Sequence, residues 1–285
     1  MNQDILKDPE FKKPMKGLDF NPARTKLPDE ILVMPKLNGV RIRWDVTHQC
    51  FRFNSGLMVQ SCDHLVERVR QSEKLRYLPL DGEAYNHDTT ISFSTINGLA
   101  RRKQSSAETE VLQLHLFDIA AYGAPYTKVR RMEIIERLFD EELVMQGASI
   151  QQVPWALYAP ADIDRVFKQC LADRYEGIMI ADPEARYTEG KGKWMWKWKP
   201  VEDREESFDG FEYATEGRNI ETFASIRLKM KDGRTFTCAG ISDEEKRRLL
   251  ASPPEIGAPI TIEYGALSDT GVPIFPRYKG VRHDQ

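Results

Sequence analysis

The chain has 285 residues, of which 41% are hydrophobic and 30% charged, a composition typical of a globular protein with one large domain or two modest ones. Its net charge of −3 excludes nucleic-acid binding through a global positive field, so local basic patches would have to provide any such affinity. The sequence has no apolar run of about 18 residues, no secretory leader, no paired-cysteine spacing and no glycine-rich phosphate loop, which argues against a membrane span, secretion, a zinc site, a disulfide framework and P-loop nucleotide binding.

The first element that suggests chemistry is a lysine at a predicted turn. The apolar run 30–34 predicts a buried strand, an alternating strand follows, and Asn38-Gly39 supplies a turn between them because both residues tolerate positive φ. Lys36 would then lie beside Arg41 and Arg43, whose charges disfavour a further cation and leave part of the lysine as a nucleophilic neutral amine. A plain hairpin with a solvated lysine at its tip is the alternative interpretation.

Much of the N-terminal part predicts scaffold. Residues 1–26 are polar and contain several prolines, which predicts an irregular leader that wraps the domain. Hydrophobic periodicity predicts amphipathic helices over residues 63–76, 128–145 and 162–172, and an apolar run predicts a buried strand over 111–120. Strands combined with helices in this way indicate an α+β domain.

Two acids and a basic cluster follow the lysine. Asp81 and Glu83 stand two residues apart on a predicted strand, so their side chains share a face and would suit magnesium, although a solvated strand edge is the more ordinary explanation. Further along, three consecutive cations could hold phosphates by charge without reading bases, or form a solvated basic loop. These cations are Arg101, Arg102 and Lys103.

Three further segments place polar or aromatic side chains at strand ends or along one strand face. Phe117 and Asp118 follow a buried run, where the aromatic ring could equally belong to the core. Glu176 begins another strand, a position that suits a metal ligand or an exposed acid. Lys197 and Lys199 share one strand face, and two neighbouring ammonium groups repel each other unless an anion such as a triphosphate lies between them.

The C-terminal part predicts a second domain. The charged run 202–206 predicts a linker, so we expect domains over residues 1–203 and 204–285. Beyond the linker, short strands are predicted at 208–213, 224–230, 235–240 and 259–266, and a helix at 243–250 begins with a capping box. Four or five strands and one helix in about 80 residues favour an OB-fold β-barrel, which commonly binds nucleic-acid strands.

In this order, the motifs resemble those of the covalent nucleotidyltransferase superfamily, and most closely those of the small ATP-dependent DNA ligases of bacteriophages. The matching segments are Lys36-x-Asn38-Gly39-x-Arg41, Asp81-Gly82-Glu83, Phe117-Asp118, Glu176-Gly177, Lys197-x-Lys199 and the C-terminal Arg282-x-Asp284. The resemblance implies an N-terminal adenylation (nucleotidyltransferase) domain of antiparallel sheets and helices, followed by a C-terminal OB-fold β-barrel.

The resemblance also implies roles for individual residues. Lys36 is the nucleophile that carries AMP, and Lys197 and Lys199 are catalytic groups that neutralise the α-phosphate. The implied metal ligands are Glu83, Glu176 and Asp81, and the implied DNA contacts are Arg101, Arg102 and Lys103. The implied nucleotide contacts are Lys36, Arg41, Glu83, Phe117, Lys197, Lys199, Arg277 and Arg282.

Three positions depart from the family pattern. Asn54 stands where an arginine is usual, and Met34 where many ligases have a glutamate that reads the adenine amino group. Gln285 replaces a C-terminal lysine that orients pyrophosphate, work that Arg277 or Lys279 could share.

The sequence therefore predicts a ligase that uses ATP and Mg²⁺ or Mn²⁺ to seal 5′-phosphate/3′-hydroxyl nicks in double-stranded DNA, through lysyl-AMP and adenylylated DNA. We expect a monomer without membrane attachment in the cytoplasm, or in the host-cell cytoplasm if the source is a virus. An RNA ligase or a capping guanylyltransferase would share most of the motifs. An inactive nucleotidyltransferase-OB module that only binds nucleic acid would share them without forming a covalent nucleotide.

Overall fold

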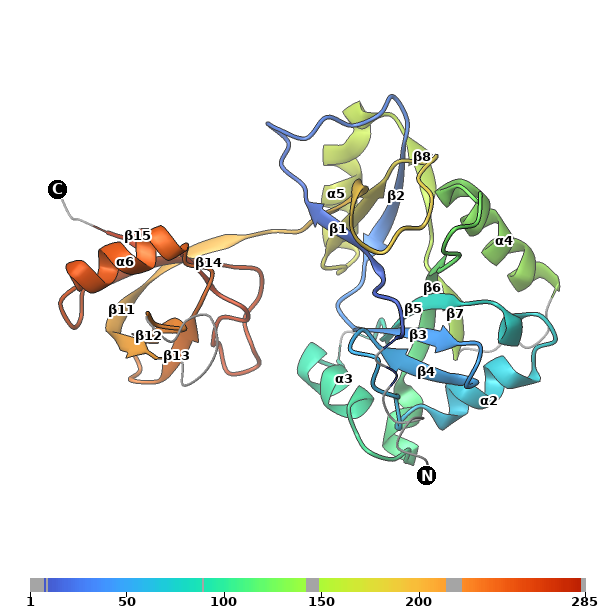
Figure 1. The fold of residues 1–285 in the computed structure, drawn as a ribbon, viewed down its shortest axis with the longest axis horizontal. Helices are drawn as coiled ribbons and strands as arrows, with labels where there is room; N and C mark the ends of the chain where they lie inside the picture. Colours follow the sequence, from blue (N-terminus) through green and yellow to red (C-terminus); the bar gives the residue numbers. More distant parts are fainter. Residues whose placement is uncertain (1–7, 9, 89, 142–148, 214–221, 283–285) are drawn as a thin grey trace. The chain divides into compact units, whose positions relative to one another are not determined.

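The computed structural model describes residues 8, 10–88, 90–141, 149–213 and 222–282, which fold into two compact units (Figure 1). The first unit spans Met1–Lys199 and the second spans Pro200–Gln285. Each unit has a buried apolar core of its own. Within the described ranges, no helix is both long and apolar enough to cross a lipid bilayer.

The first unit contains two five-stranded sheets. The first sheet has the order β1-β10-β9-β2-β8, with β1 Met15–Asp19, β2 Ile31–Lys36, β8 Ala156–Tyr158, β9 Gly177–Ala181 and β10 Gly190–Trp198. The second has the order β4-β3-β5-β6-β7, with β3 Val40–Asp45, β4 Cys50–Phe53, β5 Leu80–Tyr85, β6 Gln113–Ile119 and β7 Ile150–Gln152. Paired strands are antiparallel except β1 with β10 and β6 with β7, so the predicted α+β class with antiparallel sheets is confirmed.

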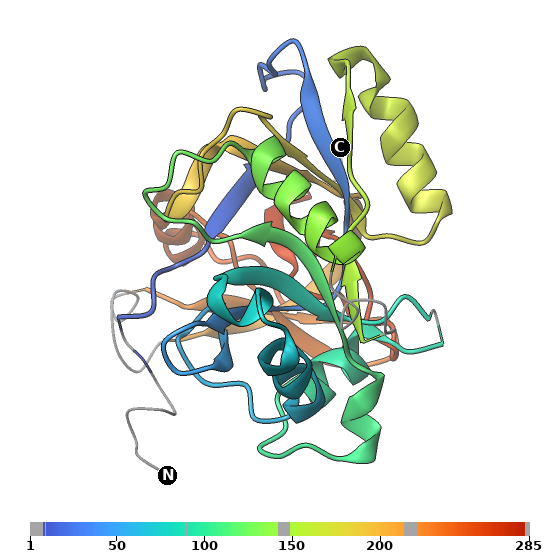
Figure 2. The same cartoon turned by 90° about the vertical axis from the view of Figure 1, so that its right-hand side faces the viewer.

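Helices flank both sheets (Figures 1 and 2). The α-helices are α2 Asp63–Gln71, α3 Phe93–Ala100, α4 Lys128–Glu141 and α5 Ile163–Ala172, and 3₁₀ turns occupy Leu75–Tyr77, Ala107–Val111 and Pro160–Asp162. All three predicted helices are present, but the first ends at Gln71, ahead of its predicted end at residue 76, because the chain turns extended at Ser72 and then forms the 3₁₀ turn Leu75–Tyr77. The predicted end of the second one falls within residues 142–148, which lie outside them.

Strand β2 is buried on both faces, which explains its continuous apolar sequence. Ile31 and Val33 pack against α5, whereas Leu32 and Met34 belong to the main core between the two sheets. The strand that ends at Lys36 is therefore fixed from both sides.

The chain passes from the first sheet to the second directly after Lys36. β2 pairs with β8 and β9 while β3 pairs with β4 and β5, so the two strands are not partners and the simple-hairpin alternative is wrong. Neither Asn38 nor Gly39 has a positive φ. Glycine is needed at position 39 for space, because a Cβ atom there would lie 2.5 Å from the carbonyl oxygen of Ala84 and 2.7 Å from Cγ of Glu83.

Part of the predicted irregular leader is in fact a strand. Residues 15–19 form β1, which pairs in parallel with β10 at the edge of the first sheet. A five-residue strand between prolines shows little periodicity of its own, and its partner lies far along the chain. As a result, β1 contributes side chains to a cavity between the two sheets.

The second unit is a closed five-stranded barrel. Its strands are β11 Glu202–Glu212, β12 Ser225–Lys229, β13 Thr235–Cys238, β14 Pro259–Tyr264 and β15 Arg277–Val281, and α6 Asp243–Ala251 lies between β13 and β14 in the chain. The strand order is β13-β12-β11-β14-β15, and a parallel bridge between Ala239 and Arg277 joins its two ends. The predicted OB-fold barrel is therefore confirmed.

The charged run 202–206 is not a linker. It is the first half of β11 and pairs with β14 along its whole length. Burial alternates along this charged run as expected for a strand. Glu206 is buried and paired with Arg204, while its neighbours are exposed. The division between the units accordingly falls after Lys199, ahead of the expected position at residue 203.

Candidate active site

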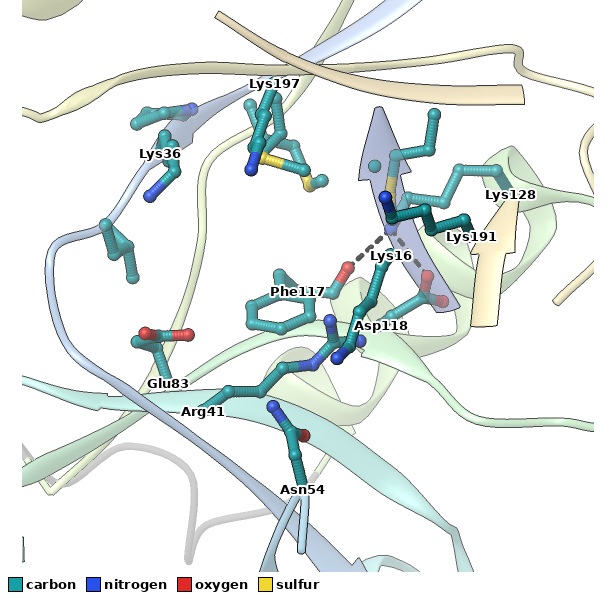
Figure 3. A pocket seen from close by; sticks show the side chains of 16 residues that line it. Lys16, Lys36, Arg41, Asn54, Glu83, Phe117, Asp118, Lys128, Lys191 and Lys197 are labelled. Atoms are coloured by element: carbon teal, nitrogen blue, oxygen red, sulfur yellow. Dashed lines mark hydrogen bonds and ion pairs between the residues drawn. The ribbon is translucent and has the colours of Figure 1, made fainter. Parts of the chain in front are cut away.

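A cavity of about 330 Å³ opens beside Lys36 between the two sheets of the first unit (Figure 3). Strands β1, β2, β9 and β10 of the first sheet and β3, β5 and β6 of the second contribute side chains to it. Its charged lining consists of Lys16, Lys36, Arg41, Glu83, Asp118, Lys128, Lys191 and Lys197. Because cations outnumber acids in this lining, the cavity suits an anionic ligand.

Lys36 ends β2, and its ammonium group pairs with the carboxylate of Glu176. The other oxygen of this carboxylate accepts a hydrogen bond from Nζ of Lys199 at 3.1 Å, so one acid joins both lysines. Burial alone would raise the pKa of Glu176, but the two lysines outweigh burial and lower it. The arrangement requires glycine opposite Lys36, because a Cβ atom at Gly177 would lie 2.1 Å from the carbonyl oxygen of Trp198.

The two arginines expected to activate Lys36 have other partners. Arg41 donates to the carboxylate of Asp81 from Nε at 2.8 Å and from Nη2 at 2.5 Å. Arg43 donates to the hydroxyl of Tyr122 at 2.9 Å and is buried. Activation of Lys36 by these arginines stays a prediction, and the immediate partner of Lys36 is the carboxylate of Glu176.

Asp81 and Glu83 both lie on β5 but have different surroundings. Asp81 is fully buried, and its two oxygens accept hydrogen bonds from Arg41 and from the hydroxyl of Tyr187. Glu83 lines the cavity, and its carboxylate has no hydrogen bond or ion pair with any residue that the structure describes. Burial raises the pKa of Glu83 to about 7, although Lys36 and Arg41 oppose the shift. The geometry therefore leaves Glu83 open to a cation and speaks against Asp81 as a metal ligand.

Lys197 and Lys199 lie at the end of β10 and just beyond it. Nζ of Lys197 is 3.2 Å from Oδ1 of Asp19, at the end of neighbouring β1. Trp198, between the two lysines, points the other way and stacks on Phe167 of α5 with ring centroids 4.1 Å apart. The predicted alternation is confirmed, and each lysine is balanced by a carboxylate in place of the expected anion.

Phe117 lies in the middle of the cavity (Figure 3). The guanidinium carbon of Arg41 is 5.0 Å from its ring centroid. The methionines Met34, Met179 and Met195 also line the cavity. An aromatic ring with thioether neighbours forms an apolar slot that suits a flat base, so the interpretation of Phe117 as purely a core residue is wrong.

The carboxylate of Asp118 ties β6 to α4 next to Phe117. This buried carboxylate accepts hydrogen bonds from Nε and Nη2 of Arg131 at 2.6 and 3.2 Å, and Nζ of Lys128 lies 3.0 Å away. Lys128 also donates to the carbonyl oxygen of Phe117 at 2.5 Å. These bonds fix α4 to β6 directly behind the ring of Phe117.

Sequence reasoning missed three cavity cations, Lys128 of α4 and two lysines that meet across neighbouring strands. Lys16 of β1 and Lys191 of β10 are partners in the register of these strands, and both line the cavity. Figure 3 shows them on the side of Phe117 opposite to Lys36. No motif marks Lys16, and only the pairing of β1 with β10 could have indicated that the two lysines meet.

The predicted DNA-binding cluster lies outside the cavity. Arg101, Arg102 and Lys103 are exposed at the end of α3. The guanidinium of Arg101 lies over the ring of Phe53 at 5.5 Å from its centroid, and Arg102 pairs with Glu108 at 2.5 Å. Neither contact engages the cluster with the cavity.

The predicted phosphate contacts of the C-terminal motif lie in the second unit. Arg277 begins β15, and Arg282 follows its end and pairs with Glu205. Lys279 pairs with Glu263 at 2.9 Å. Asp284 and Gln285 lie outside the described residues, so the roles of this motif stay predictions.

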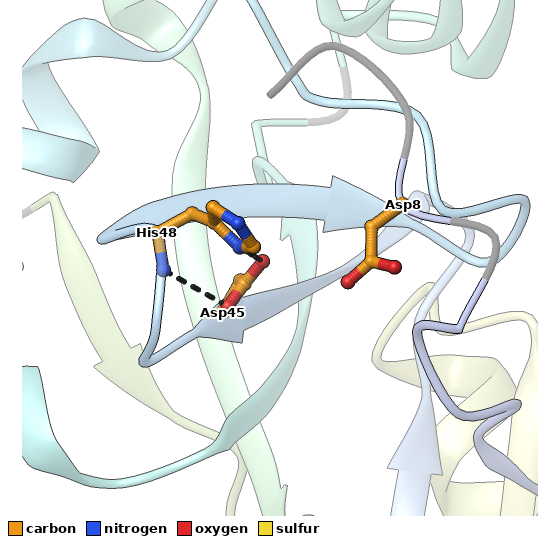
Figure 4. A group of neighbouring side chains, drawn as sticks. All are labelled: Asp8, Asp45 and His48. Carbon is orange, nitrogen blue, oxygen red and sulfur yellow. Dashed lines mark hydrogen bonds and ion pairs between the residues drawn. The ribbon is translucent and has the colours of Figure 1, made fainter. Parts of the chain in front are cut away.

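A second group of possible metal ligands, Asp8, Asp45 and His48, contributes nothing to the cavity lining (Figure 4). Oδ2 of Asp45 is 2.7 Å from Nδ1 of His48 and accepts a hydrogen bond from Nε of Arg52 at 2.6 Å. Oδ1 accepts the backbone N–H groups of Thr47 and His48. With both oxygens of Asp45 engaged, the group serves to fix the turn between β3 and β4.

A lysine at a strand end, a Lys-x-Lys pair at the end of a neighbouring strand, an open carboxylate and a following OB barrel are the features that the resemblance to the covalent nucleotidyltransferases led us to expect. Within that class, the chain belongs to the ATP-dependent DNA ligase family. The family model of the ATP dependent DNA ligase domain matches residues 13–199, and that of the DNA ligase OB-like domain matches residues 216–282.

The chain is similar to several proteins named DNA ligase. It is 30% identical over 233 residues to that of Haloarcula marismortui, a match that covers 76% of this chain and 42% of the relative. It is 24% identical over 115 residues to that of Escherichia phage T7, covering 40% of this chain and 31% of the relative. The chain spans less than half the length of the curated relatives it matches.

Two solved structures show the same fold. One is a Lig E DNA ligase, with a TM-score of 0.75, 19% identity and coverage of 95% of this chain and 99% of that chain. The other is the ATP-dependent DNA ligase of bacteriophage T7 in complex with ATP, with a TM-score of 0.55, 19% identity and coverage of 95% of this chain and 98% of that chain.

Proposed function

We propose that this protein is a DNA ligase that uses ATP to seal 5′-phosphate/3′-hydroxyl nicks in double-stranded DNA, acting as a monomer. The observation that carries the proposal is the junction of Lys36 with Glu176 and Lys199 beside a cavity whose lining has more cations than acids. The membership of the chain in the ATP-dependent DNA ligase family supports it.

In the first step, Nζ of Lys36 attacks the α-phosphorus of ATP. The ammonium group of Lys36 first loses a proton to solvent, and the neutral amine attacks. An N–P bond forms, the P–O bond between the α- and β-phosphates breaks, pyrophosphate leaves with the electron pair, and the second proton of the nitrogen passes to solvent. Lys197 and Lys199 exchange their carboxylate partners for phosphate oxygens and stabilise the charge that develops there. The exchange costs little at Lys197, because its partner Asp19 is 65% exposed and such pairs contribute at most about 1 kcal/mol.

The apolar slot and the acid strand hold the rest of the nucleotide. The purine stacks on Phe117, and the thioether groups near it exclude water from the base. Arg41 is oriented by Asp81 and lies against the same ring, within reach of the nucleoside. Charge and alignment thus carry the reaction, which requires no histidine.

Two further displacements at phosphorus would complete sealing. An oxygen of the 5′-phosphate of the nick attacks the phosphorus of lysyl-AMP, a P–O–P anhydride bond forms, the N–P bond breaks, and Lys36 takes a proton from solvent. The 3′-hydroxyl then attacks the 5′-phosphorus and gives its proton to solvent, a phosphodiester forms, the anhydride P–O bond breaks, and AMP leaves with the electron pair.

The carboxylates of this site fit Mg²⁺ or Mn²⁺. The carboxylate of Glu83 has no partner among the described residues and offers the oxygen ligands that these cations prefer, and Glu176 could offer its oxygens once its partners Lys36 and Lys199 turn to the nucleotide. When bound, the cation would supply positive charge that stabilises phosphate oxygens. Asp81 would support the site by holding Arg41.

The metal requirement of adenylation should depend on pH through Glu83. Because burial raises its pKa to about 7, Glu83 is mostly protonated below that pH and must lose its proton to bind a cation. We expect the Mg²⁺ concentration for half-maximal labelling to rise about tenfold for each pH unit below 7, since one proton competes with the metal. Titrations of Mg²⁺ between pH 5.5 and 8 would measure this, and a dependence that persists unchanged in Glu83→Gln would contradict it.

The exposed basic cluster at the end of α3 should bind DNA backbone phosphates. Replacing Arg101, Arg102 and Lys103 together by alanine is expected to make the plot of log affinity for nicked duplex against log salt shallower by about 2 to 3 units, because each lost phosphate contact removes about 0.9. Labelling of the same variant with ATP should match the wild type. An unchanged salt slope would exclude the cluster from the DNA interface.

The proposed function is tested by incubating the wild-type chain with Mg²⁺ and α-labelled ATP or GTP, followed by denaturing electrophoresis and a nick-sealing assay. We expect a labelled band from ATP and sealing of a nicked DNA duplex. Labelling by GTP alone would indicate a capping guanylyltransferase, and sealing confined to nicked RNA would indicate an RNA ligase. No label from either nucleotide, in protein free of bound AMP, would overturn the proposal in favour of a nucleic-acid-binding module.

A further inference from the structure

Tyr187 lies in the segment between β9 and β10, outside every motif that the sequence analysis singled out. Its side chain is 3% exposed. It is nevertheless bonded to the acid strand β5 and to β1, two elements that bound the cavity, and it contacts Arg41 of β3. A buried hydroxyl that joins several strands around a cavity has more contacts than packing alone requires.

The hydroxyl of Tyr187 is the centre of a closed hydrogen-bond network. It donates to Oδ2 of Asp81, and it accepts Nη2–H of Arg41 at 3.4 Å and the backbone N–H of Met15 at 3.3 Å. Arg41 completes the network. Its Nη1 donates to the carbonyl oxygen of Met15 at 2.8 Å, and its other nitrogens donate to Asp81. One phenol oxygen thus connects Asp81, Arg41 and the backbone of Met15.

From this network we infer that Tyr187 is a positioning residue for the adenylation reaction, which orients Arg41 beside Phe117 and locks β1 against the nucleotide cavity. The inference rests on the proposed function, because the group that it positions is the arginine assigned to the nucleotide. Lys16 and Gly17, which follow Met15 on β1, line the cavity, so their positions depend on the same hydrogen bonds.

The protonation of Tyr187 suits this role. Burial, together with the charge of Asp81, raises its pKa well above the ordinary value, so the hydroxyl remains a donor to Asp81 throughout the working pH range. The ring is held separately, edge-on to Tyr122 at 4.9 Å between centroids and against the guanidinium of Arg131 at 5.5 Å. Removing the hydroxyl therefore leaves the packing of the ring in place.

Tyr122 provides a matched control. Its hydroxyl also fastens the N-terminal segment, donating to the carbonyl oxygen of Lys13 at 2.8 Å, and it accepts from Arg43. It has no hydrogen bond to Asp81 or Arg41 among the described residues and does not line the cavity. Tyr122→Phe consequently loosens the same N-terminal segment and leaves the direct hydrogen bonds of Arg41 in place, although the Tyr122 hydroxyl also interacts with Tyr187.

The experiment measures lysyl-AMP formation against ATP concentration, with thermal unfolding of each variant. Tyr187→Phe is expected to raise the half-saturating ATP concentration about tenfold, the effect of one lost hydrogen bond in a charged network, with a much smaller change in the maximal rate. Tyr122→Phe should change the half-saturating concentration less than threefold, because its hydroxyl meets Tyr187 but has no hydrogen bond to Arg41 or Asp81. In an Arg41→Ala background, Tyr187→Phe should change it less than twofold, because the group that the tyrosine positions is already gone.

The outcomes separate this inference from the proposed function. A labelled wild type with an unchanged ATP dependence in Tyr187→Phe would overturn the inference alone. The same would follow if Tyr187→Phe added its full effect on top of Arg41→Ala, or if Tyr122→Phe had an equal effect on ATP, since either result indicates a merely structural role. A wild type that takes up no label from ATP would overturn the proposed function, and the inference with it.

Discussion

Replacing Lys36 by alanine is expected to abolish the covalent attachment of AMP, lowering the rate by at least about 1,000-fold. The amine is the only group of the first step that forms a bond to phosphorus, and loss of a nucleophile costs more than loss of any group that merely stabilises charge. The measurement is transfer of label from α-labelled ATP to the chain, read after denaturing electrophoresis so that only covalent product counts.

Two comparisons show whether the loss concerns the nucleophile itself. Lys168→Ala removes an exposed lysine of α5 that does not line the cavity, and it should be labelled like the wild type. Lys36→Ala should still seal a nick whose 5′-phosphate already carries AMP, because the lysine forms no bond in that last displacement. A labelled band from the Lys36→Ala variant would mean that another residue is the nucleophile.

Motif reasoning located the parts of the site that depend on local spacing. The alternation along a strand predicted that Lys197 and Lys199 share a face, and the structure has Trp198 pointing the other way against α5. The same rule predicted one face for Asp81 and Glu83. Spacing reveals the direction of a side chain, but it does not reveal which neighbour from another strand will meet it.

The partners across strands account for what the sequence did not reveal. Lys36 and its partner Glu176 are 140 positions apart and meet only because β2 pairs with β9. Asp81 looked like a metal ligand until β3 placed Arg41 beside it. Tyr187 carries no motif, since its role depends entirely on three distant segments.

The OB barrel illustrates the same limit. The strands β12, β13 and β14 were predicted from alternation, and the helix from its cap, in which Oγ of Ser242 accepts the N–H of Glu245 at 3.2 Å, whereas β15 Arg277–Val281 was not predicted as a strand. The start of β11 could not, because a run of charges is typical of an exposed linker and gives no sign that one glutamate is buried. Pairing with β14 overrides that local signal.

The largest effect on stability should come from Asp118→Asn. Asp118 is the carboxylate shared by Lys128 and Arg131, and all three side chains are buried. The substitution keeps the shape but leaves two buried cations without an anion, so the free energy of unfolding of the first unit should fall by about 3–5 kcal/mol. Urea denaturation of the wild type and the variant at pH 7 would measure the difference. Glu133→Gln is the matched control on α4, because Glu133 and Arg130 form a half-exposed pair at 2.9 Å whose loss should cost less than about 1 kcal/mol.

The pH dependence tests the charge argument separately from the shape of the side chain. Burial alone would raise the pKa of Asp118, but Lys128 and Arg131 outweigh it and hold the pKa below the ordinary value, which is about 3.9. The folded state therefore binds this proton less readily than the unfolded chain does, so the stabilisation is fully present above about pH 4 and is lost as the pH falls through the folded-state pKa. The difference in stability between the wild type and Asp118→Asn should consequently be constant from pH 5 to 8 and should shrink in acid. A difference that stayed the same down to pH 2 would mean that the asparagine disturbs packing and that the charge of Asp118 contributes little.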